Sequence, residues 1–464
     1  MNSERIEEDG LGERKIPAGA LYGISTQRAI ECFNGLSGYR LPGEFIRVLA
    51  WIKYACAVVN GQMGRLAPFK VEAIRQAAEE IVEGKWEDEF PIDAFQTGSG
   101  TSLNMNLNEV LANRAAQILG YPIGRKDPVH PNDDCNAGQS SNDVMPTASN
   151  IVLLKAIKDR LLPVLERCGE VLTAKAEEWR NVPKLGRTHL MDAVPLTLGE
   201  EFSAFAGQVK NGIAKLKEAI QPFYALPMGG TAVGNGLNAP PAFGPRVVAL
   251  LGEKLNEPLV PSRNRFETQA SRDDIVSLTG VLDTIGASLF KLLNDLRLMN
   301  SGPYGGLNEL LLPALQPGSS CMPAKVNPVL CDSLLQILCF VHGGNESVRQ
   351  CALLSGHFQL NTSSTHLVYT LFESIRLLAN GTERFTTYYL GQLEPNLSQL
   401  EVYLRGSLWE ASRLVPILGY DVATALAQRA EQRKKSMVDT VNEEVSQNPF
   451  SVQWQRALEV LLEK

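Results

Sequence analysis

The stretch DIVSLTGVLDTIGASLFKLLNDLRLM, residues 274–299, decides the fold class of this chain. Its apolar residues recur at steps of three and four, which places them along one face of an α-helix. They are Ile275, Leu278, Leu282, Ile285, Leu289, Leu292 and Leu296. Four more apolar residues widen this face, so the helix is expected to be buried on several sides. These are Val276, Val281, Phe290 and Leu293.

Three other stretches predict long helices, at residues 151–179, 196–219 and about 328–354. Each is longer than the ordinary globular helix of about 11–12 residues. Long helices with broad apolar faces predict a mainly α protein built around a bundle, with neighbouring helices supplied by other subunits. Proline- and glycine-rich segments at 120–134, 225–244 and 307–324 are expected to be loops between the helices. Beyond residue 401 the predicted helices become shorter and more charged.

The composition fits a globular protein with a sizeable core. The chain has 464 residues, of which 44% are apolar and 20% charged, and its net charge is −7. It has no basic stripe of the kind that nucleic-acid-binding proteins carry. Its eight cysteines form no CxxC pair, which is typical of reduced thiols, and none of its five histidines has zinc-ligand spacing to two cysteines. We therefore expect neither a metal nor disulfide bonds.

The N-terminal sequence MNSERIEEDG is acidic and resembles neither a signal peptide nor a transit peptide. No run of 18 apolar residues is present, so no membrane span is expected. The sequence therefore predicts a cytoplasmic protein.

Two polar segments precede predicted helices. In QTGSGTSLNMNLNEVLANRA (96–115), Ser99 and Thr101 lie just before a helix that is expected to start near Asn104. The positive N-terminal end of a helix suits a carboxylate, although an ordinary helix cap explains the same residues. In GQSSNDVMPTA (138–148), Ser140, Ser141 and Asn142 are consecutive, and one cap accounts for only one of them.

A third polar segment, KLGRTHLMDAVPLTLGEE (184–201), contains Thr188 and His189. A lone histidine is more often structural than catalytic, so this segment is weak evidence by itself. Two other segments favour no site. GGTAVGNG (229–236) lacks the Lys-Ser/Thr pair of a phosphate-binding P-loop, and HPNDD (130–134) fits a capped turn better than a metal site.

The segment GSSCMPAKVNPVLCD (318–332) is the strongest candidate for a site. Asn327 followed by Pro328 is the pattern of a helix cap and first helical residue. Lys325 and Asn327 would then stand at the positive end of a helix, where a carboxylate, or the doubly charged carboxylate left by proton loss from the neighbouring carbon, is stabilised. The alternative is a plain glycine-proline surface loop.

GSSCMPAKVNP resembles the signature of the fumarase/aspartase superfamily, which reads roughly GSSxMPxKxNP. TGSGTSLNMNLNEVLANRA, HPNDDCNAGQSSNDVMPTA and GRTHLMDAVPLTLGEEF resemble other segments of that family, in the same order. The resemblance covers nearly the whole chain and is weakest after about residue 400.

This resemblance implies three domains, at residues 1–139, 140–394 and 395–464. It implies a homotetramer in which five long helices per subunit form a central twenty-helix bundle, and active sites that three subunits share. It also implies anti elimination from a small dicarboxylate to give fumarate, without a cofactor.

The resemblance also implies residue roles. Ser319 would be the catalytic base, as an alkoxide on a loop that closes over substrate, and His189 would be the second catalytic residue. The implied substrate-binding residues are Ser99, Thr101, Ser140, Ser141, Asn142, Thr188, Lys325 and Asn327. Asp332 would pair with the active-site histidine. A secondary anion site would be formed by His130, Asn132 and Asp133.

QSSND, QTGSGT and His189 resemble class II fumarases, whereas MPAKVNPV and GLNE resemble aspartases. Fumarate hydratase is therefore the predicted activity, and aspartate ammonia-lyase is the alternative. A non-catalytic relative such as a crystallin need not retain Ser319, Lys325, Asn327 and His189 together. The sequence departs from the family pattern at three positions, with Ala137 for a basic residue, Tyr304 for arginine and Asp332 for glutamate.

Overall fold

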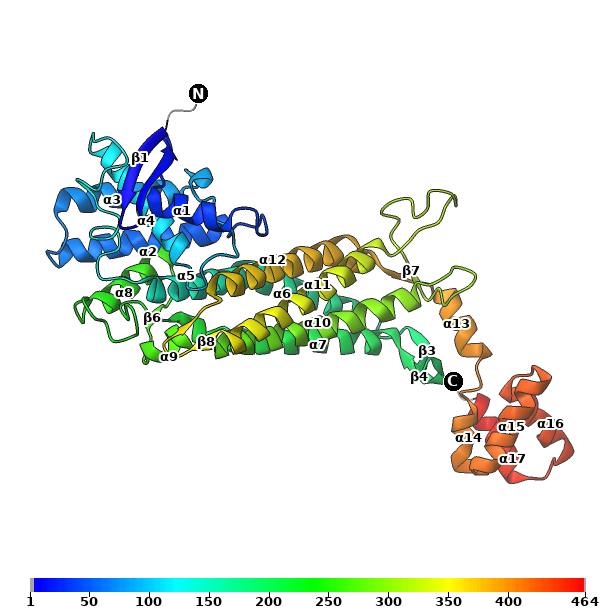
Figure 1. The fold of residues 1–464 in the computed structure, drawn as a ribbon. Helices are drawn as coiled ribbons and strands as arrows, with labels where there is room; N and C mark the ends of the chain where they lie inside the picture. The colour runs from blue at the N-terminus through cyan, green and yellow to red at the C-terminus, as the bar shows by residue number, and fades with distance from the viewer. Residues whose placement is uncertain (1–3, 463–464) are drawn as a thin grey trace. The chain divides into compact units, whose positions relative to one another are not determined.

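The computed structural model describes residues 4–462, and it is mainly α-helical, as predicted (Figure 1). The chain divides into two compact units. Unit 1 contains the described residues up to Leu165, with Asn211–Ala287 and Gln336–Gly381. Unit 2 contains Glu166–Lys210, Ser288–Leu335 and the described residues from Thr382 onward. The predicted boundaries at residues 139/140 and 394/395 differ from this division and remain a prediction.

The predicted long helices are confirmed. They are α5 (Ser141–Ala156), which continues through the π-helical turn Ile157–Leu161 into α6 (Leu162–Glu178), with α7 (Leu198–Ala219), α10 (Asp273–Met299) and α11 (Val329–Leu354). A further long helix, α12 (Ser364–Tyr388), follows them. All seven residues of the predicted apolar face of α10 are buried, from Ile275 to Leu296. Of the residues that widen that face, Leu293 is buried, whereas Val276, Val281 and Phe290 are half-buried.

Helix α10 is, among residues 4–462, the one helix long and apolar enough to cross a membrane by length and composition alone. The core helix of a soluble protein meets the same criteria. Because its polar and apolar residues separate into an exposed and a buried face, α10 has the pattern of a core helix.

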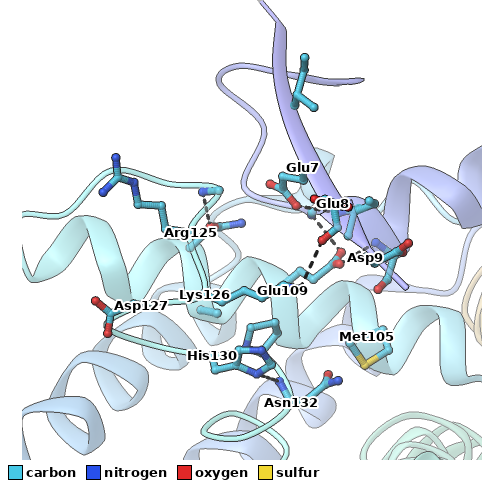
Figure 2. A pocket seen from close by; sticks show the side chains of 18 residues that line it. Glu7, Glu8, Asp9, Met105, Glu109, Arg125, Lys126, Asp127, His130 and Asn132 are labelled. Atoms are coloured by element: carbon cyan, nitrogen blue, oxygen red, sulfur yellow. Dashed lines mark hydrogen bonds between the residues drawn. The ribbon is translucent and has the colours of Figure 1, made fainter. Parts of the chain in front are cut away.

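Unit 1 begins with a hairpin that the sequence analysis did not predict, in which β1 (Glu4–Asp9) pairs antiparallel with β2 (Gly12–Pro17). The helices α1 (Ile24–Phe33), α2 (Gly43–Gln62), α3 (Pro68–Val82) and α4 (Thr101–Ile118) follow. Figure 2 shows β1 beside α4, where residues of both line a cavity. The remaining elements of unit 1 are short: β5 (Ala225–Leu226), α8 (Phe243–Leu255), β6 (Val260–Pro261), α9 (Arg265–Ala270), β8 (Gly356–His357) and β9 (Leu360–Asn361).

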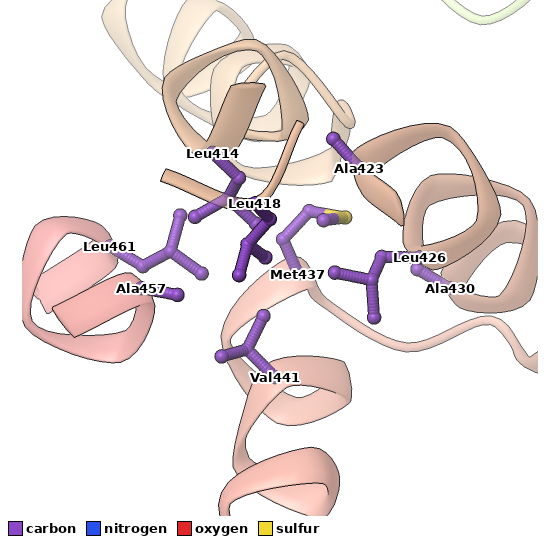
Figure 3. Close-up of a cluster of buried hydrophobic side chains, with 9 residues drawn as sticks. All are labelled: Leu414, Leu418, Ala423, Leu426, Ala430, Met437, Val441, Ala457 and Leu461. Carbon is purple, nitrogen blue, oxygen red and sulfur yellow. The ribbon is translucent and has the colours of Figure 1, made fainter. Parts of the chain in front are cut away.

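Unit 2 contains a second hairpin, formed by β3 (Pro183–Thr188) and β4 (Met191–Thr197), and a two-stranded pair, β7 (Leu310–Leu311) with β10 (Glu394–Pro395). The chain ends in short helices, as predicted: α13 (Leu397–Gly406), α14 (Ala411–Leu418), α15 (Tyr420–Arg433), α16 (Met437–Gln447) and α17 (Val452–Leu462). The last four enclose an apolar core of their own, which includes Leu414, Leu426, Met437 and Leu461 (Figure 3). These helices belong to unit 2, and a separate C-terminal domain from residue 395 remains a prediction.

Candidate active site

The segment that contains Ser319 forms a closed loop in unit 2. The backbone N–H of Gly318 donates to the carbonyl oxygen of Lys325 at 2.7 Å, and the side chain of Asn327 donates to the carbonyl oxygen of Gly318 at 2.7 Å. A side chain at position 318 would bring its Cβ within 2.6 Å of the Lys325 carbonyl oxygen, so this closure requires glycine. The two ends of the loop are therefore held together, with residues 319–324 between them.

The hydroxyl oxygen of Ser319 accepts two hydrogen bonds from backbone N–H groups. The donors are Cys321, at 3.2 Å, and Met322, at 2.9 Å. Hydrogen bonds donated to an oxygen favour its charged form, because the donor dipoles point toward the negative charge. This geometry therefore stabilises a Ser319 alkoxide, which is the form that a serine base requires.

The prediction that Asn327 caps the following helix is wrong. Helix α11 begins at Val329, and its first helical hydrogen bond runs from the N–H of Asp332 to the carbonyl oxygen of Pro328, at 3.1 Å. The Asn327 side chain is used to close the loop instead. A cavity of about 810 Å³ adjoins the loop, and Arg297, Asn300, Lys325 and Asn327 are among the residues that line it.

Thr188 and His189 lie at the tip of the β3–β4 hairpin. Thr188 pairs with Met191, so His189 and Leu190 form a two-residue turn. Both have positive φ angles, 53° and 64°, as in a type I′ turn, where asparagine and glycine are the usual residues. Backbone strain of this kind persists only where surrounding contacts enforce it, and it clusters at functional sites. His189 and Thr188 are both exposed at this tip.

The first polar segment of unit 1 lies at the N-terminus of α4. This helix begins at Thr101, three residues before the predicted start, because Gly100 is its N-cap, with a φ of 72°. The hydroxyl groups of Ser99 and Thr101 are 2.8 Å apart. Thr101 is exposed and occupies the first helical position, where N–H groups point out of the helix end.

The N-terminus of α5 adjoins that of α4, because the Asn104 side chain donates to the Ser141 hydroxyl at 3.1 Å. Ser140 is the N-cap of α5, as predicted for one of the three residues. Ser141 is buried, and the Asn142 side chain donates to the carbonyl oxygen of Ala232 at 2.8 Å. Unit 1 thus brings Ser99, Thr101 and residues 140–142 to two neighbouring helix ends.

A buried carboxylate supports this arrangement. Asp143 is fully buried and accepts hydrogen bonds from the backbone N–H groups of Ser140, Gly229 and Thr231, at 2.9–3.0 Å. Burial raises the pKa of the Asp143 carboxyl from 3.8 to about 6. The glycine-rich segment 229–236 is therefore fastened to α5 through Asp143.

Comparison with known proteins shows the family of this chain. A family model described as a lyase matches residues 12–343. A class II fumarate hydratase of Thermus thermophilus is 44% identical over 93% of this chain and 93% of its own. One from Mycobacterium tuberculosis is 46% identical over 94% of this chain and 90% of its own. The structure of a class II fumarase from Schistosoma mansoni superposes with a TM-score of 0.92, at 34% identity, over 98% of this chain and 100% of that one.

The chain belongs to this lyase family. The resemblance to the fumarase/aspartase superfamily is thereby confirmed over most of the chain.

In this lyase the predicted site residues fall into two groups. Unit 1 holds Ser99, Thr101 and residues 140–142, whereas unit 2 holds Thr188, His189 and the loop residues 319, 325 and 327. Asp332, which was predicted to pair with the active-site histidine, has an ion pair with Arg297, at 3.2 Å. A pairing of Asp332 with a histidine remains a prediction.

The predicted secondary anion site lies in unit 1, at a cavity of about 570 Å³ (Figure 2). His130 and Asn132 line it, together with Arg125 and Lys126, whereas Asp133 does not. The Nδ1 atom of His130 accepts from the backbone N–H groups of Asn132 and Asp133, both at 3.1 Å. The proton of the neutral ring is therefore on Nε2.

The sequence analysis missed two features of the site. The backbone donors of Cys321 and Met322 leave no side-chain signal in the sequence. Arg297 lies in a largely apolar helix, where only its position in the last turn marks it. Within residues 4–462 no group of three or more histidine, cysteine or acidic side chains is arranged to hold a metal ion.

Proposed function

We propose that this lyase is a fumarate hydratase, which interconverts L-malate with fumarate and water. The observation that carries the proposal is the Ser319 hydroxyl oxygen, which accepts two backbone N–H groups in the loop that also contains Lys325 and Asn327. The relatives from Thermus thermophilus and Mycobacterium tuberculosis, both class II fumarate hydratases, support the choice of substrate.

The first step removes a proton. Ser319, as the alkoxide, takes a proton from C3 of L-malate, and the electron pair of the broken C–H bond moves into the neighbouring carboxylate. That carboxylate then carries two negative charges. Lys325 and Asn327 stabilise it by charge and hydrogen bonding. Electrostatic stabilisation of this kind is the largest single contribution to the rate enhancement in many enzymes.

The second step expels the hydroxyl group. The electron pair returns to form the C2–C3 double bond, and the C2–O bond breaks on the opposite side of the molecule from the proton that Ser319 removed. The leaving oxygen needs a proton to depart as water. His189 supplies it, directly or through an oriented water, because both ring nitrogens of a protonated imidazole are donors.

The remaining predicted residues bind the substrate carboxylates. Ser99, Thr101 and Ser140–Asn142 lie at helix N-termini, which favour anions. The site residues of unit 1 and those of unit 2 meet in one site within a homotetramer. Three subunits contribute to each site, and five long helices per subunit form the central bundle. The half-buried apolar residues Val276, Val281 and Phe290 on α10 support such an assembly.

We also propose a location, a domain organisation and a secondary anion site. The protein acts in the cytoplasm, without cofactor or metal, and is organised in three domains at residues 1–139, 140–394 and 395–464. Its secondary anion site uses His130, Asn132 and Asp133, and Arg125 and Lys126 line the cavity there.

The test is an absorbance assay for the double bond of fumarate, run in parallel on L-malate and L-aspartate. Faster turnover of L-malate supports the proposal. Turnover of L-aspartate that equals or exceeds that of L-malate would identify an ammonia-lyase instead. Absence of turnover with both substrates would indicate a different substrate or a non-catalytic relative.

A further inference from the structure

Glu309 is a fully buried acid that the mechanism above does not use. Its side chain has 0% exposure and lies between two cations of unit 2. Nη1 of Arg187 donates to Oε1 at 2.7 Å. Nζ of Lys184 lies 2.9 Å from Oε2, without hydrogen-bond geometry. A buried charge is tolerated only where such partners compensate it, so Glu309 and its two cations depend on one another.

The cluster is balanced in charge. Lys184 makes a second ion pair, with Glu201 in the first turn of α7, at 2.6 Å. Two cations thus face two carboxylates. Glu201 is 26% exposed in its side chain, whereas Glu309 is inaccessible to solvent. Water can replace Glu201 as a partner, but it cannot replace Glu309.

Both cations belong to the hairpin that carries the predicted catalytic histidine. Arg187 and Lys184 lie on β3, and Arg187 directly precedes Thr188 and His189. The guanidinium group of Arg187 also lies over the ring of Tyr403, 5.3 Å from its centroid. The strained turn at His189 therefore adjoins a residue that is held on one side by a buried ion pair and on the other by an aromatic ring.

The backbone of Glu309 is fixed as well. Its N–H donates to the carbonyl oxygen of Met299 at 2.7 Å, and its carbonyl oxygen accepts from the N–H of Asn396 at 2.9 Å. Glu309 directly precedes β7, from which the chain runs on to the Ser319 loop. One residue thus connects the end of α10, through its backbone N–H, with the β3–β4 hairpin, through its side chain, at the start of the segment that leads to the catalytic base.

We propose that Glu309 is a positioning residue of the lyase reaction, which acts through Arg187 to hold the hairpin tip with Thr188 and His189 in its catalytic conformation. The inference rests on the proposed function for its catalytic consequence. Glu309 itself touches no substrate. Its effect arises because a small misplacement of a catalytic group costs about 10²-fold in rate.

The test compares Glu309→Gln, Arg187→Gln and the double variant with Glu201→Gln as the matched control. Hydrogen exchange of the backbone amides in residues 183–197 reports on the hairpin without any substrate, and helices α14–α17 serve as the internal reference. Glu309→Gln is expected to speed exchange in the hairpin at least tenfold and to leave the reference unchanged. Glu201→Gln is expected to stay near wild type. Unchanged hairpin exchange in Glu309→Gln overturns the proposal.

Kinetic measurements distinguish a positioning role of Glu309 from a purely structural one. Glu309→Gln is expected to lower kcat by about 10²-fold and to raise KM, since Thr188 and His189 both move, whereas Glu201→Gln stays within about threefold of wild type. The double variant is expected to lose no more activity than the worse single variant, because the two residues act as one unit. Full kcat in folded Glu309→Gln, or additive losses in the double variant, overturns the proposal.

Misfolding of Glu309→Gln and inactivity of the wild type can both be told apart from failure of the Glu309 proposal. If Glu309→Gln does not fold, Arg187→Gln and Glu309→Asp replace it in the exchange experiment. The hairpin exchange rate of Glu309→Asp is then expected to lie between those of the wild type and Arg187→Gln. If the wild type turns over neither L-malate nor L-aspartate, the proposed function fails, and the exchange experiment still decides whether Glu309 holds the hairpin.

Discussion

The backbone N–H of Met322 donates to the hydroxyl oxygen of Ser319 at 2.9 Å, inside a loop whose ends are joined by the hydrogen bond from Gly318 to Lys325. This relationship gives the serine oxygen a donor that does not depend on any side chain. A serine at its ordinary pKa is a poor base, so the donors around the oxygen decide whether it can take a proton.

Replacing Ser319 with alanine is therefore expected to abolish turnover while leaving the fold intact. A positioned proton-transfer group contributes about 10²–10⁴-fold in rate, so kcat should fall at least that far. KM and the circular dichroism spectrum should change little. Ser320→Ala, next to it in the same exposed loop, is the matched control and should stay close to wild type. If Ser319→Ala keeps more than about a tenth of kcat, another group is the base.

Replacing His189 with asparagine separates the turn from its chemistry. Asparagine adopts positive φ more readily than histidine does, so the hairpin should remain stable or become slightly more stable. Hydration of fumarate should nevertheless slow much more than substrate binding weakens, because asparagine cannot exchange a proton near pH 7. Melting temperature, kcat and KM are the measurements. Unchanged malate turnover would remove His189 from the mechanism.

Asp143 predicts a pH dependence of stability. Burial raises the pKa of this acid from 3.8 to about 6, so the folded chain holds the proton more tightly than the unfolded chain does. The contribution of Asp143 to the free energy of unfolding therefore falls as the pH rises from 3.8 to about 6, by about 3 kcal/mol. Asp143→Asn should lack this fall.

The measurement for Asp143 is urea unfolding between pH 4 and 7 at one protein concentration. The difference in free energy of unfolding between wild type and Asp143→Asn should shift against the wild type as the pH rises. Asp421→Asn, which removes an exposed carboxylate from α15, is the control. Parallel pH curves for wild type and Asp143→Asn would show that the buried carboxyl does not titrate in this range.

Cys321 offers a chemical test of the loop. Its thiol is exposed, and its Sγ atom lies 3.7 Å from the Ser319 hydroxyl oxygen. Alkylation with iodoacetamide would place an amide group beside the Ser319 hydroxyl, so the wild type should lose most of its activity. Cys321→Ser should resist, although it keeps the exposed Cys32 and Cys339. Equal inactivation of both proteins would point to another cysteine.

The sequence predicted the helices better than it predicted the site geometry. The face of α10 could be read directly, because burial of its apolar residues follows the helical repeat. The start of α4 could not be predicted in this way, because its cap is Gly100 in a left-handed conformation. The hydroxyl residues that follow Gly100 are typical of a loop. The role of Asn327 was missed because its side chain bonds back to Gly318.

The two hairpins show another limit of prediction from the sequence. Residues 183–197 contain no asparagine or glycine at the turn, so His189 and Leu190 give no hairpin signal. The β1–β2 hairpin does carry one, since Asp9 at the end of β1 is followed by Gly10 in the two-residue turn, between alternating exposed and half-buried residues. The ion pair of Glu309 with Arg187 joins residues that lie far apart in sequence, and no local pattern predicts it.

We propose that Ser319 exchanges a proton with C3 of the substrate during anti addition and elimination. Proton NMR of malate formed from fumarate in D₂O tests it most directly. The wild type is predicted to give malate with a single deuterium at C3 in one configuration only, and Ser319→Ala is predicted to give no product. A mixture of both C3 configurations would rule out anti addition, and labelled malate formed by Ser319→Ala would rule out Ser319 as the base.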